Sequence, residues 1–158
     1  MARNGEIKLK ASTALSLNKK DQMSGFLGEY SPNITEGSRI TLPKKLRKYI
    51  RGAEVVLSKG FEKCIFIYNR EDWMNSAQKQ VAEPREGMIR VELERYLYTS
   101  ATESPIDVQG RIVIPANLLK YAEIDKETSV LGVGDHIEVW SEKNWEAYSS
   151  RISGKLDA

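Results

Sequence analysis

Cysteine and histidine are scarce in this 158-residue chain, which holds one of each, Cys64 and His136. A lone cysteine cannot form an internal disulfide, and this is typical of proteins from a reducing compartment. One histidine and one cysteine without clustered carboxylates also argue against a catalytic centre or a metal site. We therefore expect no enzyme activity, no metal and no cofactor, and we expect structural roles for both residues.

Long apolar runs are missing as well, and none approaches the roughly 20 residues that cross a bilayer. Residues 1–20 lack the apolar stretch and the small-residue cleavage site of a secretory signal. Glycine-rich phosphate loops and the HExxH, CxxC and GxSxG motifs do not occur. The sequence therefore predicts a globular cytoplasmic protein that has no membrane partner and no small-molecule substrate.

The charged residues are unevenly distributed, although the formal net charge is only +2. Residues 1–51 carry eleven Lys or Arg against four acids, whereas residues 101–158 carry six against ten. Such asymmetry is expected of a chain that binds a polyanion near its N-terminal half. A solvated basic face would produce the same distribution, so charge alone leaves both interpretations open.

An internal repeat is the strongest feature that the sequence does have. Residues 33–43, NITEGSRITLP, align without a gap on residues 105–115, PIDVQGRIVIP. The same offset of 72 continues beyond the motif and pairs Leu46 with Leu118, Gly60 with Gly132, and Trp73 with Trp145. An ungapped register of this length predicts two structurally equivalent copies.

Each copy predicts the same local structure. Apolar and β-branched residues alternate in 39–42 and 111–114, as they do in half-buried strands. Pro43 and Pro115 follow, and proline suits the first position of a helix. The further elements expected are short helices at 44–50 and 116–122, and strands at 55–57, 64–68, 129–131 and 136–140. His136 is expected within the last of these strands.

A second helix is expected to close each copy, with Asn69 and Ser141 as N-cap residues. Two aromatic pairs have the spacing of a hydrophobic staple: Tyr68 with Trp73, and Trp140 with Trp145. The predicted segments are 1–23 as a flexible extension, 28–73 as the first repeat, 74–99 as a linking helix region, 100–145 as the second repeat and 146–158 as a C-terminal tail.

The residues after Pro43 are basic, and those after Pro115 are nearly neutral. The first copy has Lys44, Lys45, Arg47 and Lys48 where the second has Ala116, Asn117, Leu119 and Lys120. Arg39 begins the strand before this run, where a guanidinium can reach a base edge while the run neutralises phosphates. We expect DNA binding through Arg39 and the basic run, with a smaller contribution from Arg111.

The alternative for these arginines is a role in the turn itself. Arginine recurs at both Arg39 and Arg111, and in the second copy Asp107 lies four residues earlier. That carboxylate could pair with Arg111 or organise an Asx turn. The two roles are compatible, because a turn that fixes the direction of an arginine can also aim it at DNA.

The pattern Asp-x-x-Gly-Arg-x-x-x-Pro, whole at 107–115 and degenerate at 35–43, resembles that of the MraZ family. The segments FLGEY at 26–30 and IEVW at 137–140 support the resemblance, which covers residues 24–148. It implies a β-rich α+β fold: a pseudo-two-fold, double swapped-hairpin barrel of AbrB/SpoVT type, built from two tandem repeats with short helices.

The resemblance also implies a nucleoid-associated transcriptional regulator of the division and cell-wall gene cluster, expected to act as a repressor. Members of the family bind repeated promoter boxes on double-stranded DNA as ring-shaped homo-oligomers. The family's DNA-binding arginine maps onto Arg39, with Arg111 as its second-copy equivalent, and its lysines map onto Lys44 and Lys45. The motif residues expected to shape the turns are Thr35, Pro43, Asp107, Gly110 and Pro115.

The first copy departs from the family pattern in its turn. Thr35 stands in place of the aspartate, and Gly37-Ser38 replaces the usual residue followed by glycine. A hydroxyl supports a turn less well than a carboxylate, so the turn before Arg39 is expected to differ in shape. The alternative function is an oligomeric scaffold or protein-interaction module that has lost specific DNA reading.

Overall fold

The computed structural model describes residues 25–83 and 85–157, so the predicted extension at 1–23 lies outside the described residues. The strands are β1 (Phe26–Tyr30), β2 (Arg39–Thr41), β3 (Glu54–Lys59), β4 (Ile65–Asn69), β5 (Thr102–Pro105), β6 (Arg111–Val113), β7 (Thr128–Gly134) and β8 (Ile137–Ser141). The helices are α2 (Lys44–Arg47), α3 (Arg70–Ala82), α4 (Arg90–Ser100), α5 (Ala116–Tyr121) and α6 (Glu142–Asp157). The predicted β-rich α+β class with short helices is confirmed.

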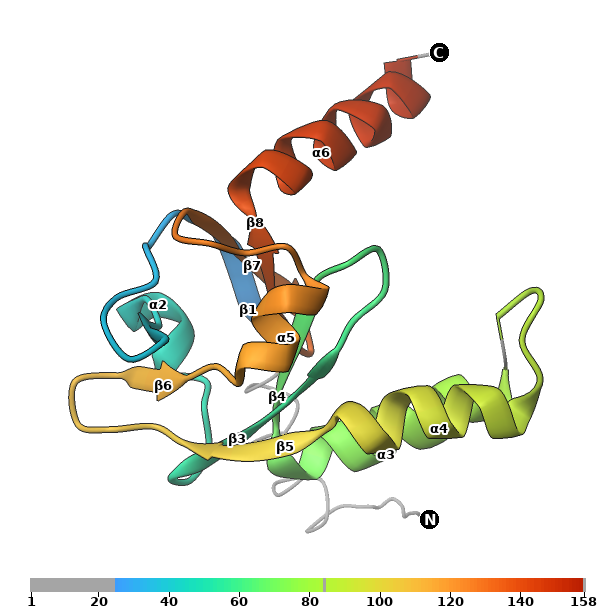
Figure 1. Cartoon of the computed structure of the whole chain (residues 1–158), viewed down its shortest axis with the longest axis horizontal. Coiled ribbons are helices and arrows are strands. Elements are labelled where there is room, and N and C mark those ends of the chain that lie inside the picture. The colour runs from blue at the N-terminus through green and yellow to red at the C-terminus, as the bar shows by residue number, and fades with distance from the viewer. Residues whose placement is uncertain (1–24, 84, 158) are drawn as a thin grey trace, which may run out of the picture.

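The strands form one six-stranded antiparallel sheet, ordered β1-β7-β8-β4-β3-β5, and a separate two-stranded ribbon, β2-β6. Within the described ranges these strands do not close into the expected barrel, because β2 and β6 pair with each other and leave β1 and β5 as open sheet edges. Figure 1 shows the ribbon beside α2 and α5, with α3 and α4 packed together and α6 projecting away.

The two copies of the repeat exchange strands around two hairpins. The pairs β3-β4 and β7-β8 each lie within one copy, whereas β1 pairs with β7, β5 with β3, β2 with β6 and β4 with β8, so each hairpin is flanked by strands of the other copy. Ile40 lies directly opposite Ile112, and Phe66 lies directly opposite Glu138. Both pairs are 72 residues apart, so a pseudo-two-fold axis passes through both. The repeat predicted from the sequence is therefore a structural repeat.

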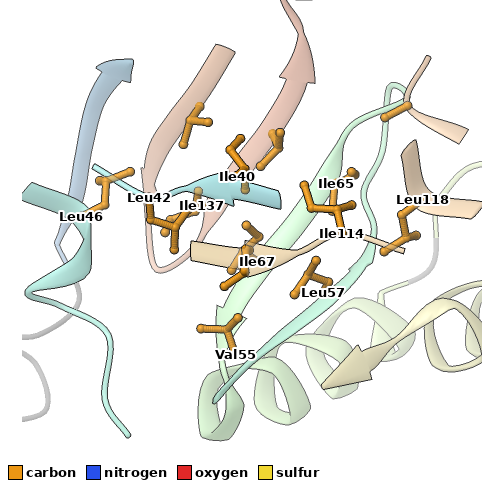
Figure 2. Packing of buried hydrophobic residues seen from close by; sticks show 14 of the residues in the cluster. Ile40, Leu42, Leu46, Val55, Leu57, Ile65, Ile67, Ile114, Leu118 and Ile137 are labelled. Carbon is orange, nitrogen blue, oxygen red and sulfur yellow. The ribbon is translucent and has the colours of Figure 1, made fainter. Parts of the chain in front are cut away.

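The sheet is covered on both faces, and its alternate residues enter two different cores. Ile65 and Ile67 of β4 face the ribbon, whereas Phe66 and Tyr68 face α3 and α4. Figure 2 shows the first core, in which Ile40 of the ribbon packs above the sheet residues. Because the ribbon and its two short helices seal this core, their positions are fixed by packing.

Several ends of the elements differ from those predicted. The helix after Pro43 stops at Arg47 instead of residue 50. Asn69 does not cap α3, because its side chain accepts from the N–H of Arg51 (2.7 Å) and donates to the carbonyl oxygen of Tyr49 (3.0 Å). Tertiary contacts therefore take the side chain that the local sequence assigns to the helix.

The second copy follows its prediction more closely at this point. The hydroxyl of Ser141 accepts from the N–H of Asn144 (3.0 Å) and so caps α6, and the rings of Trp140 and Trp145 lie 5.3 Å apart. The segment predicted as a tail continues α6 to Asp157. His136 lies in the turn before β8 and not within the strand. No helix in the described ranges is long and apolar enough to cross a membrane.

Candidate nucleic-acid interface

The outer face of the β2-β6 ribbon presents both motif arginines. Ile40 and Ile112 are fully buried beneath the ribbon, so their neighbours along each strand point outward. Arg39 lies opposite Val113, and Thr41 lies opposite Arg111. The two arginines therefore occupy the two ends of one exposed, two-stranded surface.

The turn before Arg111 is organised by a carboxylate. Asp107 accepts hydrogen bonds from the N–H groups of Gln109 (2.9 Å) and Arg111 (2.9 Å), and from Nε of Arg111 (2.8 Å). These contacts, the backbone bond from Arg111 first, hold the pKa of Asp107 below its ordinary value. Gly110 has a φ of 83°, a conformation that glycine adopts readily. The predicted Asx turn and arginine pair are both present.

The turn before Arg39 has a different shape, as the sequence predicts. Two consecutive residues, Gly37 (φ 82°) and Ser38 (φ 59°), are left-handed here, whereas only Gly110 is left-handed in the second turn. The Thr35 hydroxyl donates to the carbonyl oxygen of Arg39 (3.2 Å). The Arg39 guanidinium folds over Gly37, and its Nη1 donates to the carbonyl oxygen of Glu36 (3.3 Å). Among the described residues it has no carboxylate partner.

Each turn is attached to the helix of the other copy. The N–H of Leu42 donates to the carbonyl oxygen of Gly110, and the N–H of Ile114 donates to that of Ser38, both at 2.9 Å. The guanidinium of Arg47 lies directly on the α-carbon of Gly110. The basic helix α2 follows Arg39 in the chain, but its contacts are with the turn of the second copy. Strand exchange places α2 behind the turn of Arg111, and α5 behind the turn of Arg39.

The residues of α2 divide into two kinds. Lys44, Lys45 and Lys48 are exposed to solvent, whereas Arg47 is half-buried against the turn of the second copy. The Nε atom of Arg47 is buried and has no hydrogen-bond partner among the described residues. The lysines are thus open to an anion, and Arg47 sits beneath them as a fixed charge. Pro43 and Pro115 each stand immediately before a helix and provide its N-cap position.

A polar cluster around His136 was not recognised from the sequence. Its Nδ1 lies 2.8 Å from a carboxylate oxygen of Asp135, and its Nε2 lies 2.9 Å from one of Glu138. The signal available in the sequence was the pair of acids around this histidine, Asp135 immediately before it and Glu138 two residues after it. Cys64 is buried nearby, and burial raises the pKa of its thiol. Within the described ranges no group of three or more His, Cys, Asp or Glu could hold a metal ion.

Comparisons with known proteins identify the family of this chain. The model of the family described as "MraZ protein, putative antitoxin-like" matches residues 26–90 and 97–157. Proteins named "Transcriptional regulator MraZ" are 38% identical in Syntrophomonas wolfei, 35% in Moorella thermoacetica and 33% in Desulforamulus reducens. In each case the match covers 84% of this chain and 92% of the relative. On both the matched residues and the doubled motif, the chain belongs to the MraZ family.

Proposed function

We propose that the chain is a DNA-binding transcriptional regulator that contacts double-stranded DNA with the outer face of the β2-β6 ribbon. The observation that carries this proposal is the placement of Arg39 and Arg111 on one exposed face, next to the exposed lysines of α2. A two-stranded ribbon fits the major groove of B-form DNA, where arginine pairs with guanine O6 and N7. The name of the relatives supports the same function.

The proposed contacts follow from the chemistry of each group. Arg39 and Arg111 reach base edges, and Lys44, Lys45 and Lys48 neutralise phosphates. Arg47 adds charge beneath them while it supports the second turn. The remaining motif residues, Thr35, Pro43, Asp107, Gly110 and Pro115, set the shape of the turns and the starts of the helices.

The family resemblance supports a more specific role: repression of the division and cell-wall gene cluster through repeated promoter boxes, by a ring-shaped homo-oligomer. An assembly that presents several ribbons would bind repeated boxes through effective concentration, even where each single contact is weak. The helix α6 is consistent with assembly, since it has no buried residue and exposes Leu156 at its end.

The test is titration of the purified protein with labelled DNA from upstream of its own gene and with a shuffled fragment of equal composition. We expect tighter binding to the upstream fragment. We also expect the logarithm of the affinity to fall with the logarithm of salt concentration, by about 0.9 for each phosphate contacted. Equal affinity for both fragments, or affinity that is insensitive to salt, would contradict sequence-specific DNA binding.

A second candidate is an oligomeric scaffold that no longer reads DNA. The altered turn of the first copy favours it, because this turn carries the acid Glu36 and lacks the motif aspartate at Thr35. Light scattering together with the DNA titration separates the two functions. An intact assembly that binds no DNA at low salt would support the scaffold and exclude the regulator.

A further inference from the structure

We infer that the main DNA contact is a composite of the two copies, in which the turn of the second copy (107–111) acts together with helix α2 of the first. The turn of Arg39 is then the weaker contact. This inference rests on the proposed function and reverses the ranking of the two arginines that the family resemblance implies. It follows from which helix the strand exchange places behind which turn.

The geometry joins α2 to the second turn at three points. Thr41, shortly before α2, lies opposite Arg111 in the ribbon. The N–H of Leu42 donates to the carbonyl oxygen of Gly110 (2.9 Å), and Arg47 lies on the α-carbon of Gly110. Because strand, junction and helix all contact residues 107–111, α2 is held against the turn that carries Arg111.

The charges on the two sides of the ribbon differ sharply. The helix behind Arg111 contributes Lys44, Lys45, Arg47 and Lys48, whereas the helix behind Arg39 contributes Ala116, Asn117, Leu119 and Lys120. The tip of the second turn is uncharged, and that of the first carries Glu36. A phosphate backbone is therefore attracted much more strongly to α2 and the turn of Arg111 than to α5 and the turn of Arg39.

The second turn is also better prepared to read a base. Asp107 binds the Nε of Arg111, which orients the guanidinium and leaves both terminal nitrogens without a partner among the described residues. Those two nitrogens are the ones that a bidentate contact with guanine requires. In contrast, Nη1 of Arg39 is already bonded to the carbonyl oxygen of Glu36 (3.3 Å). A preoriented side chain loses less conformational freedom on binding.

The tip of the second turn offers two further groups to a groove. Val108 is 100% exposed, and an apolar side chain in this position can contact a thymine methyl group. Gln109 is exposed beside it, and its amide can pair with adenine. Arg47 adds a second reason, because its buried Nε has no hydrogen-bond partner, and none of the ion pairs found among the described residues involves α2. A polyanion would balance the charge of α2.

The first experiment compares matched alanine variants by fluorescence anisotropy, with the upstream fragment and its shuffled control. We expect Arg111→Ala to weaken binding to the upstream fragment at least about tenfold and to reduce the preference over shuffled DNA. Arg39→Ala should weaken it less than about threefold. Lys48→Ala and Lys120→Ala occupy equivalent positions in the two copies, and only Lys48→Ala should reduce the salt dependence. Thermal unfolding confirms that each variant is folded.

The second experiment moves the charge from one side to the other. The variant Lys44→Ala/Lys45→Asn/Ala116→Lys/Asn117→Lys exchanges the first two residues of the two helices and so moves two positive charges from α2 to α5. In this background we expect Arg39→Ala to become more damaging than Arg111→Ala. If Arg39→Ala is the more damaging change in both backgrounds, the composite contact is wrong although DNA binding stands. If the unaltered protein does not prefer its upstream fragment, the proposed function fails and the inference fails with it.

Discussion

The guanidinium of Arg47 occupies the space in which a Cβ atom on Gly110 would lie. These two residues belong to different copies of the repeat, and their contact locks the turn of one copy to the helix of the other. Gly110 is required there for two reasons: its φ of 83° is left-handed, and a side chain would displace Arg47.

Replacement of Gly110 by alanine therefore tests the junction between the copies. We expect Gly110→Ala to lower the free energy of unfolding by roughly 2–4 kcal/mol, from backbone strain together with the displaced guanidinium. Gly134→Ala is the matched control, because its φ is 81° but no atom lies within 4 Å of its added Cβ. That variant should lose only about 1–2 kcal/mol. Equal losses in urea unfolding would show that the contact with Arg47 contributes nothing.

The carboxylate of Asp107 makes the second turn sensitive to acid. Its pKa is lower in the folded protein than in the unfolded chain, so the ionised group stabilises the fold above pH 4 and loses this effect as the pH falls further. We expect Asp107→Asn to lower the melting temperature at pH 7. The difference from the unaltered protein should shrink as the pH approaches 3. A difference that is independent of pH would mean that the charge of Asp107 is irrelevant to the turn.

His136 makes the stability of the fold fall as the pH rises, opposite to the effect of Asp107. Burial disfavours its charged form, but hydrogen bonds to Asp135 and Glu138 outweigh this and raise its pKa to about 9. The imidazolium therefore stabilises the fold fully below pH 6.5, and this contribution is lost as the pH rises through 9. Burial raises the pKa of Cys64 and of Tyr68, so both stay protonated in the folded protein across this window. The Cys64 thiol of the unfolded chain ionises near pH 9 and therefore adds a smaller loss of stability at the alkaline end.

We expect the free energy of unfolding to fall by on the order of 3 kcal/mol between pH 6.5 and 9.5 because of His136. His136→Gln should remove most of this slope while leaving stability at pH 9.5 nearly unchanged. The measurement is urea unfolding across the range, together with the NMR titration of the single imidazole. A titration midpoint near 6.5 would contradict the prediction.

The pair Ile40 and Ile112 tests the pseudo-two-fold axis. Both side chains are fully buried and lie opposite each other, so Ile40→Ala and Ile112→Ala should each cost about 2–5 kcal/mol and agree within about 1 kcal/mol. The double variant should depart from the sum by at least about 0.5 kcal/mol, because the two residues share one cavity. Leu93 lies in the other core, so Ile40→Ala and Leu93→Ala should add. Unequal single losses would show that the two halves pack differently.

The strands and their faces could be predicted from the sequence because alternation determines which residues point inward. The alternation around Ile40 and Ile112 predicted two buried positions, and both are buried. It could not show that these residues face each other, since two strands with the same pattern can pair with any compatible partner. The length of α6 was not predicted: the segment after residue 145 was expected to be a tail, whereas the helix continues to Asp157.

In the candidate site, too, local contacts could be predicted from the sequence and long-range contacts could not. Asp107, Gly110 and Arg111 form the turn that their spacing predicted, because every contact within it spans four residues or fewer. The position of α2 depends on a bond between Leu42 and Gly110, which are separated by much of the chain. Local sequence could therefore identify the basic helix but not the turn that it serves.

Strand exchange also governs how this protein folds during synthesis. Phe26 pairs with Gly134 and Ile40 pairs with Ile112, so the early strands acquire their partners only after most of the chain has left the ribosome. Pairings this distant in sequence are slow to form, since loop closure precedes any gain from contacts. The first copy must wait, with its apolar strands uncovered, for a second copy to be made. We therefore expect its nascent form to be the species most exposed to aggregation and to chaperones.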